Sequence, residues 1–179
     1  MICNKLFFGG AGFLPDSVMD LAASSLAVGL NLPLEKINTS SDPFDLLASP
    51  RNKSSFIQLR GDVGIINDHG ISWLEALSSW KQPLILAVPA FYKDLPSSSA
   101  QAYVALSEKL SVNLIGIIQL GGYWDLPKRR LDGMPWCGFI PYSNDVDNLG
   151  NYDLDMDHLD EHLNDLICIL WRRFKCLTK

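Results

Sequence analysis

Cysteine is scarce in this sequence of 179 residues, and its spacing excludes several kinds of site. No two of the four cysteines lie closer than eight residues: Cys3, Cys137, Cys168 and Cys176. The absence of a C-x-x-C pair excludes the usual zinc-ribbon and thioredoxin-like motifs. Sparse cysteines are typical of a reducing compartment. The segment Met1–Phe8 holds one lysine and too short an apolar run for a signal peptide. We therefore expect a cytoplasmic protein.

Long apolar runs and basic clusters are also missing. No stretch of about 18 apolar residues occurs, so the sequence predicts no membrane-spanning helix. The longest basic run is Lys128–Arg130, and 15 Lys and Arg against 20 Asp and Glu leave a formal charge of -5. Because an acidic chain repels phosphate backbones and anionic lipids, we expect neither nucleic acid nor a membrane surface as a partner.

The sequence does contain a regular alternation of short apolar runs and helix-length segments. Apolar residues make up 47% and charged residues 20%, which is ordinary for a globular fold. Strands are expected at residues 5–8, 34–37, 56–59, 84–88, 114–120 and 136–140. Helices are expected at residues 16–29, 72–80, 97–110 and 157–174, the last inside an acidic C-terminal segment, 153–176. This alternation predicts a single α/β domain over residues 1–179, a three-layer sandwich with a mostly parallel central sheet.

The loop after the first expected strand is rich in glycine. Ligands of parallel α/β sheets bind beyond the carboxyl ends of the strands, and a glycine loop opening a helix is a common phosphate site there. A working phosphate loop needs a lysine before its closing Ser or Thr. Here Asp16 precedes Ser17, and Pro15 removes one N–H donor. The loop is therefore a degenerate phosphate loop, or a tight turn in which Asp16 or Ser17 caps the helix.

Further stretches follow the pattern of one protein family. Three of them align with loop motifs of the family: Gly9–Ser17 with G-x-x-x-x-x-G-K-[ST], Lys36–Ser40 with the strand end K-P-V-x-[ST]-G, and Arg60–Gly64 with E-G-A-G-G. The other three align with its later elements: Trp73–Val88 with a helix followed by a buried strand, Leu114–Gln119 with a strand that ends in Asn, and Gly138–Tyr142 with G-x-I-P. On these motifs residues 5–142 resemble dethiobiotin synthetase, of the P-loop NTPase superfamily that includes cobyrinic acid synthases.

The resemblance implies a function and a set of site residues. The implied reaction is the carboxylation and ring closure of 7,8-diaminopelargonic acid in biotin biosynthesis, with ATP and Mg²⁺, by a homodimer. Lys36 would be catalytic, and Ser17 and Asp62 would bind the metal. The implied nucleotide-binding residues are Gly9, Gly10, Gly12, Ser17, Gln119 and Pro141.

Other patterns have simpler interpretations. His158–His162 spells the H-x-x-E-H pattern of some zinc peptidases, but only 17 residues follow it, which favours a solvated helix face. Asp153–Asp157 starts like a calcium loop but lacks the glycine at position six, which favours the acidic beginning of a helix. Asp68 and His69 are interpreted as a turn. The aromatic pairs Phe91–Tyr92 and Tyr123–Trp124 lie in ligand-facing loops, where they could pack, stack on a flat ligand or contact a partner.

Three hypotheses follow from the sequence. The first is an ATP-dependent enzyme that uses Lys36, Ser17 and Asp62. The second is a catalytically inactive homologue that binds a small molecule or a partner protein with the same face, and the replacements at Pro15 and Asp16 favour it. The third is an unrelated Rossmann-like domain, which a different strand order would reveal.

Overall fold

The computed structural model describes residues 5–48, 54–90, 99–141 and 156–177. The strands are β1 (Lys5–Gly10), β2 (Leu34–Asn38), β3 (Ser55–Asp62), β4 (Pro83–Pro89), β5 (Asn113–Leu120) and β6 (Trp136–Ile140). The helices are α1 (Asp16–Leu30), α2 (Pro43–Ala48), α3 (Trp73–Ser79), α4 (Ser99–Leu110), α5 (Leu126–Leu131) and α6 (Met156–Leu177). Each strand expected from the sequence is present, and the predicted α/β class is confirmed.

The six strands form a single parallel sheet in the order β2-β3-β1-β4-β5-β6. This order differs from the 3-2-1-4-5-6 order of dinucleotide-binding domains. From β1 the chain builds β2 and β3 on one side of the sheet, and then crosses to build β4, β5 and β6 on the other. The carboxyl end of β1 therefore lies where the direction of sheet growth reverses, which is the usual ligand position in open α/β sheets.

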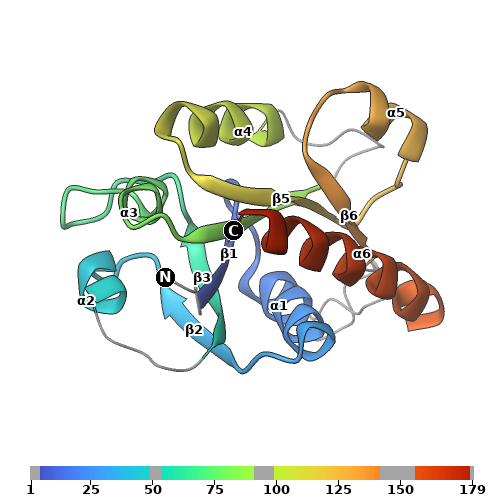
Figure 1. Ribbon diagram of the computed structural model, residues 1–179, viewed down its shortest axis with the longest axis horizontal. Helices are drawn as coiled ribbons and strands as arrows, with labels where there is room; N and C mark the ends of the chain where they lie inside the picture. The colour runs from blue at the N-terminus through green and yellow to red at the C-terminus, as the bar shows by residue number, and fades with distance from the viewer. Residues whose placement is uncertain (1–4, 49–53, 91–98, 142–155, 178–179) are drawn as a thin grey trace.

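Helices cover both faces of this sheet, as a three-layer sandwich requires (Figure 1). One buried cluster joins α1 and α6 to one face, and a second joins α2, α3 and α4 to the other. Successive residues of a strand enter opposite clusters, as Ile85 and Leu86 of β4 do. Because β4 is buried on both faces, its sequence is a continuous apolar run rather than an alternating one, and the same holds for β1 after Lys5.

The helix ends agree with local sequence signals in one case and differ in another. Ser72 caps α3, where its side chain accepts from the N–H of Glu75 and the Glu75 carboxylate accepts from the N–H of Ser72. The predicted capping of α1 by Asp16 or Ser17 is wrong. Pro15 occupies the cap position, has an extended backbone and makes no side-chain cap bond, because proline has no side-chain acceptor.

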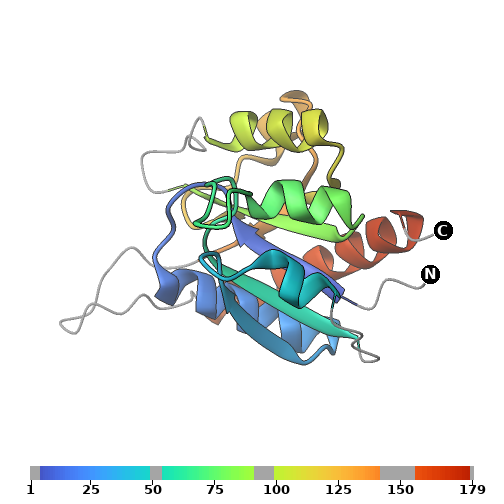
Figure 2. The ribbon, with the colours of Figure 1, turned by 90° about the vertical axis from the view of Figure 1, so that its left-hand side faces the viewer.

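The loops that follow β1 and β3 lie at one end of the sheet, opposite to the end of α6 (Figure 2). We call this end the carboxyl edge. Among the described residues, no helix combines the length and the apolar character that a membrane crossing requires.

Candidate functional site

The glycine loop at the end of β1 is closed by its own atoms. The N–H of Ala11 donates to the carbonyl of Ala87 on β4 at 2.8 Å. The Leu14 side chain is buried and folds back onto Gly10, where an added Cβ would lie 3.1 Å from Leu14 Cδ1 and 3.2 Å from the carbonyl oxygen of Gly12. A phosphate cradle needs free N–H groups facing an open space. In this loop an apolar side chain and a carbonyl oxygen take up part of that space.

Tyr103 of α4 reaches across the sheet edge and ties two of its loops together. Its hydroxyl donates to Oδ1 of Asp62, at the end of β3, and a backbone hydrogen bond from Gly12 reaches the same hydroxyl. Asp62 Oδ1 also accepts from the N–H of Gly64 at 2.8 Å. A Cβ on Gly64 would lie 2.9 Å from the Tyr103 ring, so only glycine permits this approach. Burial and the Asp62 carboxylate both raise the pKa of Tyr103 above its ordinary value.

On the opposite face of the sheet, Asp20 of α1 collects three donors from β2 and β3. Lys36 Nζ lies 2.8 Å from Asp20 Oδ2 and Arg60 Nη2 lies 2.5 Å from it, while Gln58 Nε2 donates to Oδ1 at 2.7 Å. The register explains the convergence, because Lys36 pairs with Gln58 across the two strands. We call these four residues the Asp20 cluster.

Attraction between the Asp20 carboxylate and the cations Lys36 and Arg60 holds the Asp20 cluster together. Burial by itself would raise the pKa of Asp20, but hydrogen bonds from Arg60, Lys36 and Gln58 together with the Lys36 charge lower it to about 2. The Asp20 side chain is 27% exposed. Lys36, the predicted catalytic residue, thus forms an ion pair with Asp20 of α1. Its proposed part in catalysis stays a prediction.

Gln119, predicted to contact a nucleotide base, is fully buried at the end of β5. Its Nε2 donates to the carbonyls of Gly121 and Tyr123 at 2.8 and 3.0 Å, and its Oε1 accepts from Arg129 of α5 at 2.8 and 3.2 Å. The Arg129 guanidinium lies over the Trp136 ring, 4.8 Å from its centroid. Gln119 therefore fixes the loop that joins β5 to α5. The nucleotide contacts predicted for it and for Pro141 stay predictions.

The two predicted metal ligands lie in different surroundings. Ser17 is exposed in the first turn of α1, and no hydrogen bond of the described residues joins it to Asp62. In the described part of the chain, no three His, Cys, Asp or Glu side chains gather as metal ligands would.

The other sequence patterns are described only in part. Asp153–Asp155, the side chain of His158 and the pair Phe91–Tyr92 lie outside the described residues. His162 packs against the ring of Phe139 at 4.6 Å between centroids. Asp68 and His69 form a turn, as predicted, with the N–H of His69 donating to Asn67.

Large apolar side chains stand exposed on the loops of the carboxyl edge. Phe13 is 86% exposed, and Ile65 and Ile66 are 64% and 65% exposed. Their loops are neighbours, because the N–H of Val63 donates to the carbonyl of Gly10 and Tyr103 bridges both loops. We call Phe13, Ile65 and Ile66 the apolar rim. Exposed apolar groups that gather on rigid loops are typical of interaction sites.

A hollow of about 240 Å³ opens beside the apolar rim, between the ends of β2 and β3 and the loop after β3. We call it the edge hollow. Its lining combines polar, acidic and apolar residues, among them Asn38, Thr39, Asp62, Ile65, Ile66 and Asp68.

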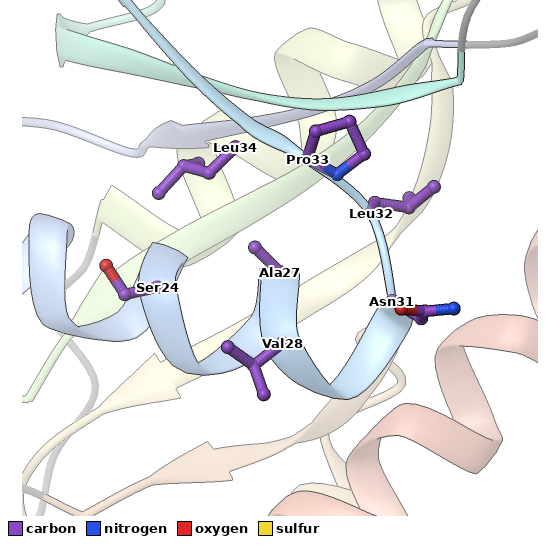
Figure 3. Close-up of a pocket in the computed structure, with 7 residues that line it drawn as sticks. All are labelled: Ser24, Ala27, Val28, Asn31, Leu32, Pro33 and Leu34. Atoms are coloured by element: carbon purple, nitrogen blue, oxygen red, sulfur yellow. The ribbon is translucent and has the colours of Figure 1, made fainter.

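A larger hollow of about 540 Å³ lies between the end of α1 and the start of β2 (Figure 3). It is lined by uncharged residues, among them Ala27, Val28 and Leu34. It lies at the amino end of β2, away from the loops of the carboxyl edge. Since ligands of parallel sheets bind at the carboxyl edge, we assign the candidate site to the apolar rim and the edge hollow.

Sequence reasoning missed two residues that organise this edge, Asp20 and Tyr103. The signal for Asp20 was an acidic residue between the apolar residues Met19 and Leu21 of the expected helix, with the cations Lys36 and Arg60 on or beside later strands. Tyr103 had no local signal, because its partners Asp62 and Gly12 are 41 and 91 residues away in the chain.

Comparisons with known proteins do not support the family resemblance seen in the sequence. No family model matches the chain, and no curated protein matches it. Among solved structures, it is similar to the N-acetylneuraminic acid (sialic acid) synthetase from Leptospira borgpetersenii serovar Hardjo-bovis in complex with citrate. The identity is 12%, the match covers 99% of this chain and 85% of that chain, and the TM-score is 0.32. So low a score supports no inference. The predicted resemblance to dethiobiotin synthetase is therefore wrong, because short motif matches on a common α/β scaffold produced it.

Proposed function

We propose that this chain is a catalytically inactive relative of P-loop proteins that binds a partner protein through the apolar rim of its carboxyl edge. The proposal rests on the arrangement of the loop after β1, which is closed where a phosphate would bind and exposes an aromatic side chain to solvent. Leu14 packs onto Gly10 where a phosphate would be held, and the backbone of Gly12 bonds to the Tyr103 hydroxyl, while Phe13 of the same loop is 86% exposed to solvent.

Burial of the apolar rim in a partner would be favourable. A large apolar side chain gains about 1.5 to 3 kcal/mol when it leaves water, and aromatic anchors commonly dominate interface energies. The rim is also held in place before binding. Gly12 and Gly64, the neighbours of Phe13 and Ile65, are both bonded into the Tyr103–Asp62 connection. A pre-ordered loop loses less conformational entropy on association.

Site-specific photocrosslinking tests the proposal directly. A benzoylphenylalanine in place of Phe13 or Ile66, in cells that make the protein natively, should give a discrete covalent adduct with one partner. Val28 is a matched control, because it is 81% exposed and apolar but lies near the other end of α1, beside the hollow of Figure 3. Adducts of equal yield at positions 13 and 28, or none at position 13, would contradict the proposal.

Nucleotide binding supplies the second test. A ligand at 100 times its Kd stabilises a folded protein by about 2.7 kcal/mol, which a melting curve resolves easily. We expect no change of melting temperature with millimolar ATP and Mg²⁺. A saturable increase that Lys36→Ala abolishes would favour the ATP-dependent hypothesis over the one proposed here.

A further inference from the structure

The edge hollow is a preformed feature with fixed walls. Asn67 Nδ2 donates to the carbonyl of Ser41 at 3.4 Å, and His69 Nδ1 lies 3.8 Å from Asp42 Oδ2, so the loops after β2 and β3 are linked to each other. Within the hollow, Asp62 is held by the N–H of Gly64 and the hydroxyl of Tyr103. These bonds hold the lining in one arrangement.

The described residues that line the edge hollow include two carboxylates and no lysine or arginine. The carboxylates are those of Asp62 and Asp68. The donors that hold Asp62, an N–H and a phenol, are both neutral and both reach Oδ1. In the described part of the chain, lysine and arginine ion pairs involve neither carboxylate. The site thus attracts a positive group.

The volume of the edge hollow and its apolar lining residues indicate which kind of positive group fits it. The volume of about 240 Å³ is below the range of roughly 300–1,000 Å³ usual for whole small-molecule ligands. Ile65 and Ile66 belong to the lining and also to the apolar rim. A basic side chain has the matching structure, since an aliphatic stem can lie along the isoleucines while its charged end reaches the carboxylates.

We propose that the edge hollow receives a lysine or arginine side chain of the partner protein. This inference rests on the proposed function, and it adds that the partner segment carries a basic residue beside the apolar residues that meet Phe13. The formal charge of -5 favours such a partner, because an acidic chain steers a basic segment toward itself.

The direct test uses Nα-acetyl-lysine N-methylamide as the probe, titrated into the full chain and followed by NMR at the amides of Gly61 and Gly64. We expect saturable shifts that are absent with the norleucine analogue, which has the stem but no charge. Asp62→Asn with Asp68→Asn removes both charges while keeping the acceptor for Gly64 and Tyr103. This double variant should weaken binding about fivefold or more.

Asp45→Asn is the matched control, because it removes one exposed charge from α2, after the loop that follows β2, and Asp45 neither lines the hollow nor takes part in the bonds that link its walls among the described residues. It should leave the affinity for the probe within about twofold, as expected for a screened surface charge. Equal binding of the norleucine analogue, or no saturable shift with the lysine probe, would overturn the inference.

Selection from a displayed library of random peptides separates the two proposals. We expect enriched peptides to pair a basic residue with large apolar residues, to lose the basic preference on the double variant, and to lose binding on Phe13→Ala. Enrichment of apolar residues alone would refute the basic-side-chain inference and leave the proposed function standing. Enrichment that Phe13→Ala does not change would refute the proposed function. Binding of the lysine probe without any basic preference among peptides would mean that the occupant is a free amine.

Discussion

Replacing Asp20 by asparagine tests whether the Asp20 cluster stabilises the fold by charge. The pKa of Asp20 falls from 3.8 to about 2 in the folded protein, and each unit corresponds to about 1.4 kcal/mol of folding free energy. Because the Asp20 side chain is 27% exposed, solvent screening reduces this contribution, and we expect Asp20→Asn to cost about 1 to 2 kcal/mol at pH 7. The melting temperature should fall by about 2 to 8 °C.

The pH dependence gives the sharper result. A carboxyl group with a lowered folded pKa stabilises the protein fully above its unfolded pKa, and that contribution is lost as pH falls through the folded pKa. The difference between wild type and Asp20→Asn should therefore be constant from pH 8 to about pH 5. It should shrink between about pH 4 and pH 2, as judged by urea unfolding followed by circular dichroism.

Two further variants identify the cause. Lys36→Met should cost much less in the Asp20→Asn background than in the wild type, because the ion pair is already absent there. Glu108→Gln is the control for a change of charge, since Glu108 is exposed on α4 and no ion pair of the described residues involves it. Equal stabilities of wild type and Asp20→Asn at pH 7, or a difference that persists unchanged at pH 2, would refute the reasoning.

Three other predictions concern single buried contacts. Tyr103→Phe should destabilise the fold by about 1 to 2 kcal/mol. Because the folded pKa of Tyr103 is raised, this contribution should be complete below about pH 10 and should decrease as pH rises from there toward the folded pKa, as alkaline unfolding of both proteins would show. Burial raises the pKa of Cys137 to about 11, so iodoacetamide should label the exposed Cys168 and Cys176 in the native protein and label Cys137 only on unfolding, which peptide mass mapping can check. Gly116→Ala should destabilise by more than about 2 kcal/mol in urea unfolding, because the new Cβ would lie 2.4 Å from the Cys137 sulfur and 2.6 Å from a carbonyl oxygen.

The sheet could be predicted from the sequence because its signals are local. Buried parallel strands require continuous apolar runs, and β4 and β5 show them plainly at Leu84–Val88 and Leu114–Leu120. The short helix α5 was missed although its start carries a helix signal. Asp125 caps it by accepting from the N–H of Lys128, and Pro127 follows in the first turn. A strict use of the capping rule would have found this helix.

The strand order and the residue pairs that depend on it could not be predicted in the same way. Lys36 and Arg60 converge on Asp20 only because β2 and β3 are adjacent in the sheet and α1 lies over the face they share. From the sequence alone Lys36 matched a catalytic lysine, since a motif records spacing along the chain and contains no information about the partner across the sheet. The structure supplies that partner, Asp20.

The loop after β1 shows why its glycine pattern alone does not identify a protein family. Glycines at positions 9, 10 and 12 are compatible with a phosphate cradle, but they are equally required when side chains close the loop. Gly12 has a φ of 90°, and a Cβ on Gly9 would lie 2.2 Å from Val63. Whether such glycines hold a ligand or admit a side chain is decided by what fills the space above them. Val63 and Leu14 fill part of it here, and Phe13 of the same loop is 86% exposed. A glycine-rich loop that is closed by its own side chains can in this way support an exposed apolar residue without offering a place for an anion.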